Sequence, residues 1–194
     1  MSLIELMVGV ALAALLLTLG VPSFVTGMQN RQIRTAADAL QNGLVAARTE
    51  ALRRNRVVKF ELVAPGGWSI GCDPADNTVV DGEEVCPELI QSRPPDEGTP
   101  NATVETSQIA VASGTPAGTA VFEDSLRFTS LGRVTADTLP PGNNAVFLVS
   151  NPAGGACVAD GGEMRCLSLV VTASGQIRMC DPAVAAGSGD PRAC

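Results

Sequence analysis

A single carboxylate, Glu5, stands in an otherwise uncharged stretch at the start of the chain. The uncharged and mostly apolar residues continue from Leu6 to Val21, and Pro22 follows directly. A charged side chain deep in a membrane helix costs roughly 2.5–3.5 kcal/mol on insertion scales, so this carboxylate needs a partner or a purpose. A free amine on residue 1, one helical turn away or in a neighbouring subunit, is a group that can pair with it.

Two ordinary interpretations of this stretch fit poorly. A secretory signal peptide would carry a basic region before the apolar residues and a small-residue cleavage site after them, and neither pattern is found. A plain membrane anchor fits only marginally, because about 16 residues fall short of the roughly 20 that usually span a bilayer. A plain anchor also gives no reason for Glu5.

The six cysteines all lie in the later part of the chain. An even number predicts disulfides in an oxidising compartment. Zinc is the alternative, but the chain has no histidine and no Cys-x-x-Cys pair, so we expect no metal site. The sequence leaves the connectivity open, and we favour the short-range set of pairs. Each pair closes a small loop and contributes about 2–3 kcal/mol. These pairs are Cys72–Cys86, Cys157–Cys166 and Cys180–Cys194.

The segment from Arg31 to Asn55 has helical periodicity. Its apolar positions recur every three or four residues and are Ile33, Ala36 or Ala37, Leu40, Leu44, Ala47 and Ala51. Together with the uncharged N-terminal stretch, this segment predicts one long helix of about 54 residues and roughly 80 Å. Its N-terminal part would be apolar on all sides and its C-terminal part apolar on one side only. Gly20 and Pro22 are expected to bend or loosen it, because proline lacks a backbone donor and clashes with the preceding turn.

Beyond Asn55 the pattern changes to short extended runs. Val57–Val63 and Trp68–Cys72 flank Pro65-Gly66-Gly67 and predict a β-hairpin. Polar loops are expected at 73–82 and 93–101. Further strands are predicted at 102–112, 120–122, 126–128, 132–134, 145–150, 166–172 and 175–180. A helix followed by antiparallel strands predicts an α+β domain in which the apolar stripe covers one face of the sheet.

Charge and residue types exclude several functions. Residues 1–60 hold seven Lys/Arg and three acidic residues, a net charge of +4. Residues 61–194 hold six Lys/Arg and 17 acidic residues, a net charge of −11. The acidic character of residues 61–194 argues against a broad nucleic-acid surface in this part of the chain. The absence of histidine removes Ser-His-Asp and Cys-His catalysis, Lys59 lies in no catalytic motif, and no phosphate-binding loop is found. We therefore expect no enzyme and no cofactor.

The N-terminal sequence resembles a known family. Met1-Ser2-Leu3-Ile4-Glu5-Leu6-Met7, the apolar helix and Val21-Pro22-Ser23-Phe24 are similar to the start of mature type IV pilins and type II secretion pseudopilins. Their motif is aromatic-Thr-Leu-Ile-Glu-Leu, so Met1 departs from the usual phenylalanine. No basic leader ending in glycine precedes it, and we expect either a mature, leader-processed chain or a recombinant start codon at the native first position.

Later segments extend the resemblance to the GspH/FimT group of minor pilins. Residues 47–55, Ala-Arg-Thr-Glu-Ala-Leu-Arg-Arg-Asn, are similar to the end of that group's long helix. Leu126–Val134 and Leu169–Cys180 look like its two late strand-turn-strand segments. The resemblance implies a type IV pilin fold, with a membrane and filament-core helix over residues 1–27, an amphipathic half over 28–56 and a β-rich head over 57–194.

The same resemblance implies how the chain is used. It predicts cleavage by prepilin peptidase, N-methylation of Met1, storage in the inner membrane with the head in the periplasm, and assembly with other major and minor pilins. Glu5 would then be an assembly residue that pairs with the amine of residue 1 in a neighbour. We favour a structural minor pilin of a type IV pilus, near its tip or priming complex.

Two alternatives stay open. One is a GspH-like pseudopilin of type II secretion, and the other is a DNA-binding competence pilin. Gly175-Gln176-Ile177-Arg178 keeps only the second arginine of the Gly-Arg-x-Arg motif of DNA-binding relatives, which leaves Arg178 and Arg192 as weak candidates for DNA contacts. The arginines of the long helix are better explained as a solvated face or as intersubunit ion pairs.

Overall fold

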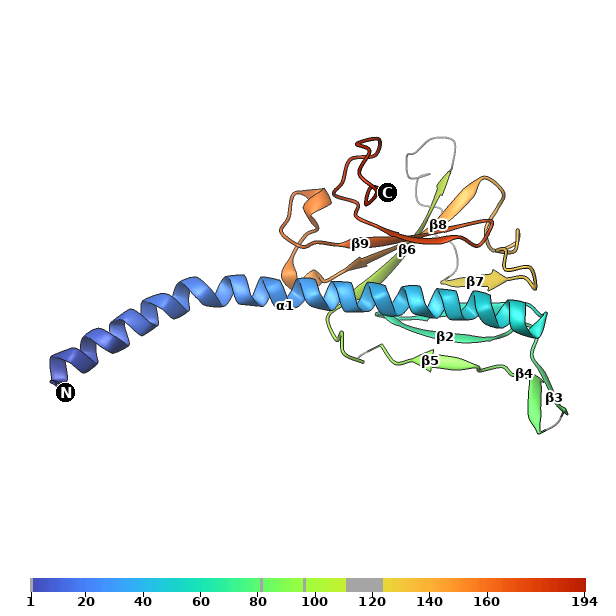
Figure 1. The fold of residues 1–194 in the computed structure, drawn as a ribbon, viewed down its shortest axis with the longest axis horizontal. Coiled ribbons are helices and arrows are strands. Elements are labelled where there is room, and N and C mark those ends of the chain that lie inside the picture. The colour runs from blue at the N-terminus through green and yellow to red at the C-terminus, as the bar shows by residue number, and fades with distance from the viewer. Residues whose placement is uncertain (1, 81, 96, 111–123) are drawn as a thin grey trace.

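The computed structural model describes residues 2–80, 82–95, 97–110 and 124–194. Helix α1 (Leu3–Arg54) forms the stem, and its N-terminal part extends away from a β-rich head in a gentle curve (Figure 1). The helix ends because Asn55 adopts a left-handed conformation, φ 52°, and its N–H caps the carbonyls of Ala51 and Leu52. The predicted long helix is confirmed.

The head contains two four-stranded antiparallel sheets and a separate hairpin. One sheet has the order β5-β2-β1-β7, the second has the order β10-β9-β8-β6, and β3 pairs with β4. The bounds are β1 Val58–Val63, β2 Gly67–Cys72, β3 Asp76–Val80, β4 Glu83–Cys86, β5 Gln91–Arg93, β6 Thr103–Ala110, β7 Ser125–Phe128, β8 Asn143–Ser150, β9 Leu167–Thr172 and β10 Ile177–Cys180. Two short 3-10 helices, η1 (Pro152–Gly154) and η2 (Val158–Asp160), lie between β8 and β9.

The α+β class is as predicted, but the strand assignment needs three corrections. The expected single sheet is divided in two, because β1 pairs with β2 and β7 whereas β8 pairs with β6 and β9. The segment 73–82 was expected to be a loop, yet it contains β3. The strand expected at 132–134 is reduced to one bridge between Phe128 and Val134. The strand expected at 120–122 lies outside the described residues.

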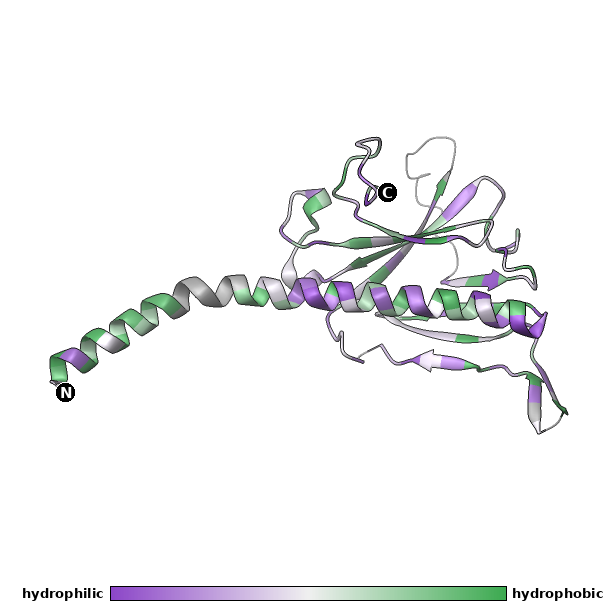
Figure 2. Cartoon of the chain, in the orientation of Figure 1, coloured by the Kyte–Doolittle hydropathy of each residue, from purple (hydrophilic) through white to green (hydrophobic). Residues whose placement is uncertain are grey.

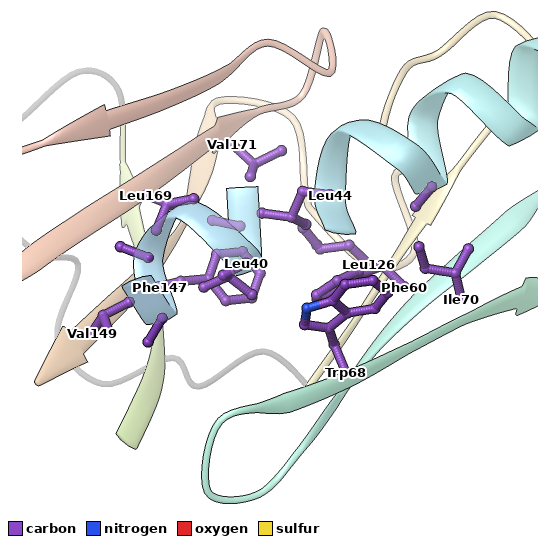
Figure 3. Packing of buried hydrophobic residues seen from close by; sticks show 14 of the residues in the cluster. Leu40, Leu44, Phe60, Trp68, Ile70, Leu126, Phe147, Val149, Leu169 and Val171 are labelled. Atoms are coloured by element: carbon purple, nitrogen blue, oxygen red, sulfur yellow. The ribbon is translucent and has the colours of Figure 1, made fainter. Parts of the chain in front are cut away.

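The core lies between α1 and both sheets (Figure 3). The helix contacts β1, β2 and β7 of the first sheet and β8, β9 and β10 of the second. All the expected apolar positions are buried, and both alternatives at one of them, Ala36 and Ala37, are buried together with Ile33, Leu40, Leu44, Ala47 and Ala51. Phe60 contributes an edge-on ring contact with Phe147 of the second sheet, at a centroid distance of 6.2 Å. One helix face therefore joins the two sheets into one core.

Gly43 allows the closest contact between α1 and the first sheet. A Cβ at this position would lie 2.7 Å from Cε2 of Trp68 and 3.1 Å from Cε2 of Phe60. Trp68 is itself 4% exposed and fixed in the core, so it has little room to withdraw. A residue that weakens an isolated helix is thus required by the tertiary packing.

Three disulfides close loops at the edges of the head. They join Cys72 to Cys86, Cys157 to Cys166, and Cys180 to Cys194. These are the three pairings favoured from the sequence. The last one holds the C-terminal segment beside β10, where Asp181 also forms a parallel bridge with Ala193.

Gly43→Ala should destabilise the chain, whereas Gly27→Ala should not. Both glycines lie in α1, and alanine favours a helix by up to about 1 kcal/mol. At Gly43 the added methyl overpacks the core, which typically costs about 1–3 kcal/mol, so we expect net destabilisation. At Gly27 nothing lies within 4 Å of the added Cβ, so no loss is expected. Denaturant unfolding of the full chain in detergent measures both, and a stabilised Gly43→Ala protein would contradict the close contact.

Candidate functional site

The first turns of α1 are mostly hydrophobic (Figure 2), and residues 2–16 are exposed. Their large apolar side chains have exposed fractions between 53% and 78%, and they are Leu3, Ile4, Leu6, Met7, Val8, Val10, Leu12, Leu15 and Leu16. Nearer the head, Phe24, Val25 and Met28 are also exposed. An apolar surface of this extent on an isolated chain marks a site covered by other molecules.

Glu5 lies in the first turn of α1, at the far end of this surface. Its carboxylate accepts a hydrogen bond from the backbone N–H of Ser2 at 3.4 Å. Ser2 precedes the first helical residue, so Ser2-x-x-Glu5 has the spacing of a capping box, and a carboxylate there also suits the helix dipole. This local role was not predicted from the sequence, although the Ser-x-x-Glu pattern indicates it.

The assembly roles of the terminal residues are not decided by this geometry. Met1 lies outside the described residues, so its methylation and its pairing with Glu5 stay predictions. Helix α1 continues through Gly20 and Pro22 without a break in its assignment, and a local bend at these residues stays a prediction as well. Within the described residues, no helix combines the length and apolarity needed for a membrane span.

The three later segments that carried the family resemblance meet at one place in the head. Nε of Arg48, on α1, donates to the carbonyl of Gly132 at 3.2 Å. The turn at Gly175, with φ of 81°, comes so close to this carbonyl that a Cβ on Gly175 would lie 1.8 Å from the oxygen. The N–H of Val134 also donates to Ala173 at 3.1 Å. These contacts attach both late turns to the helix, so the segments have a structural role in positioning the stem.

Most arginines of the stem pair within the chain. Arg34 contacts Asp38 at 3.3 Å. Arg56, just beyond the end of α1, contacts Asp76 of β3 at 3.4 Å. Glu50 accepts contacts from Arg53 and Arg54, each at 2.8 Å. Burial alone would raise the pKa of Glu50, but hydrogen bonds and charge from the two arginines outweigh it and lower that pKa.

The two candidate DNA-contact arginines lie close to the loop closed by the last disulfide. Arg178 donates to the backbone carbonyl of Cys194 at 3.0 Å. Arg192 makes two hydrogen bonds to Asp190, at 3.1 and 2.7 Å. This side-chain pairing lowers the pKa of Asp190 to about 2. Both guanidinium groups therefore have partners inside the chain, and the geometry adds nothing in favour of DNA.

A hollow of about 480 Å³ lies between α1 and the β9–β10 side of the head. Its lining is mixed in charge and is made by Asn30, Arg34, Asp38, Gln41, Arg165, Leu167, Met179, Cys180, Asp181 and Arg192. The side chain of Asn30 accepts from the N–H of Arg165 at 2.8 Å, which fixes the loop after η2 to the helix. In the part of the chain that is described, no three His, Cys, Asp or Glu side chains group as metal ligands.

Comparisons with known proteins identify similar chains. The family model GspH, described as type II transport protein GspH, matches residues 36–175. No curated protein matches at the threshold applied. Two crystal structures of the Pseudomonas aeruginosa type IV minor pilin FimU are similar, both at 21% identity. The first match has a TM-score of 0.49 and covers 81% of this chain and 95% of the FimU chain. The second has a TM-score of 0.47 and covers 80% of this chain and 98% of the FimU chain. The solution structure of E. coli GspH has 13% identity and a TM-score of 0.42, covering 79% and 90%.

Glu50→Gln should destabilise the chain in a pH-dependent manner. Because the folded-state pKa of Glu50 is lowered, its stabilising contribution is present above the unfolded value of 4.5 and is lost as the pH falls below it. We expect a loss of about 0.5–1 kcal/mol at neutral pH. Unfolding free energies of the full chain at pH 7 and pH 3 test this. Glu105→Gln, at an exposed position of β6, is the control, and a Glu50→Gln loss equal at both pH values would contradict the ionic origin.

Proposed function

Because the chain belongs to the GspH family, we propose that it is a structural minor pilin, incorporated through its N-terminal helix into a type IV pilus and placed in the tip or priming complex. The role is one of assembly, without catalysis. The main support is the apolar N-terminal part of α1, whose described side chains from Leu3 to Leu16 are exposed, whereas one stripe of the C-terminal part of the same helix is buried in the core. A filament core of parallel helices would cover the exposed side chains.

Glu5 gives this assembly its specificity. A carboxylate that enters a bundle of apolar helices is stabilised only by an opposite charge or by donors that replace water. The N–H of Ser2 provides one donor at 3.4 Å, so the group is oriented but accepts further partners. The amine of residue 1 in a neighbouring subunit is the partner we propose, and it would fix the axial register between helices.

The route to the filament begins in the inner membrane. Residues 1–27 would hold the chain there as a single-pass anchor, after prepilin peptidase has processed the N-terminus and residue 1 has been methylated. The head would lie in the periplasm, where three disulfides can form. Other major and minor pilins are the partners along the helix.

A second function has a specific observation in its favour. The matched family is described as a type II transport protein, which supports a pseudopilin of the type II secretion system. Deletion of the gene separates the two: loss of surface pili indicates the pilus, and loss of secreted folded proteins with intact pili indicates type II secretion.

Glu5→Leu should block assembly while leaving the chain folded and membrane-bound. Removing the charge eases insertion, by roughly 2.5–3.5 kcal/mol on insertion scales, but removes the proposed partner of the neighbouring amine. We expect the variant in the membrane fraction with its three disulfides formed, and absent from sheared filaments. Glu5→Gln, which keeps an acceptor at nearly the same shape, tests whether the charge itself is required. Normal amounts of Glu5→Leu in sheared filaments would refute the role of Glu5.

A further inference from the structure

The hairpin β3–β4 projects from the head without joining either of the larger sheets (Figure 1). It lies beyond the C-terminal end of α1, at the end of the head opposite to the apolar stem. An isolated two-stranded hairpin is at best marginally stable in water, so its persistence here needs an explanation.

The base of the hairpin is braced by several contacts. The disulfide Cys72–Cys86 ties β4 to the end of β2. Arg54 of α1 donates to the backbone carbonyls of Glu84 and Val85 at 3.2 and 3.0 Å, and Arg56 pairs with Asp76. These contacts hold the hairpin at a fixed angle to the helix.

The described apolar side chains of β3 are exposed to solvent. Val79 and Val80 are 64% and 59% exposed, although consecutive residues of a strand point to opposite faces. Leu89, just beyond β4, is 58% exposed. Among the described strands, β3 pairs only with β4, so one edge of it is open to an incoming chain. A braced projection with apolar side chains on both faces has the form of a docking element.

The charge of the hairpin indicates the chemistry of its partner. The sequence from Asp76 to Cys86 contains four acidic residues and no lysine or arginine. Glu84 and Glu88 are exposed. Arg56 pairs with Asp76, and Arg54 forms an ion pair with Glu50. A surface that receives this hairpin therefore has to supply cationic side chains around an apolar contact.

We propose that β3–β4 docks on a basic, partly apolar surface of the head of the neighbouring pilin on the distal side of the filament. This inference rests on the proposed function, because the apolar stem then points toward the base of the filament and the hairpin points away from it. Contact through the hairpin adds a head-to-head interaction to the contact between helices.

Photo-crosslinking in filament-forming cells tests the proposal with the full chain. A benzophenone amino acid replaces Val79, and the control probe replaces Val158 of η2, which is 43% exposed at the other end of the head. We expect Val79 to form an adduct with another pilin, mapped by mass spectrometry to a basic surface, and Val158 to form none at that surface. Adding Glu84→Lys to the Val79 probe should reduce the adduct at least about fivefold, because it places like charges together. Peptide mapping of Cys72–Cys86 confirms that each variant is folded.

A probe at Leu12 in the apolar stem separates failure of this proposal from failure of the proposed function. Crosslinks from Leu12 to other pilins without any from Val79 would overturn the docking role and leave the pilin function standing. No pilin adduct from either position would overturn both. An adduct of Val79 with a protein that is not a pilin, or one insensitive to Glu84→Lys, also overturns the proposed docking.

Discussion

The burial of one stripe of α1 between two sheets holds the whole molecule together. The stripe contacts strands of both sheets, and its small residues let the helix approach them closely. The contact of Gly43 with Trp68 shows how tight this approach is. Because the same helix continues beyond the head, packing that stabilises the head also fixes the direction of the apolar stem. Stability and assembly thus depend on one continuous element.

Much of this fold could be predicted from local patterns. The apolar period after Arg31 identifies the buried stripe residue by residue, and the alternation around Pro65-Gly66-Gly67 identifies the first hairpin. The division into two sheets could not be predicted, because β1 pairs with β7 some 65 positions later and such pairing leaves no local signal. The exposed strand β3 was missed since its polar start, Asp76-Asn77-Thr78, has the composition of a turn.

The candidate site was predictable in part. Glu5 stands out in the sequence because charge is rare in apolar helices, and its solvent-exposed position at the first turn agrees with a partner outside the chain. The hydrogen bond from Ser2 to Glu5 follows from the Ser-x-x-Glu spacing of a capping box, which could have been predicted from the sequence. The meeting of Arg48, Gly132 and Gly175 could not be found from sequence, because each segment gains its role only from the other two.

The distribution of charge then argues for contacts at two ends of the subunit. Several stem arginines are already paired with carboxylates of the same chain, so the stem offers neighbours mainly apolar surface and Glu5. The acidic hairpin lies at the opposite end. Contacts made through unlike surfaces at two ends are heterologous, and they repeat along an axis instead of closing on a two-fold pair. In the proposed filament, the helix would therefore set the depth of the subunit and the head would contact the subunit above it.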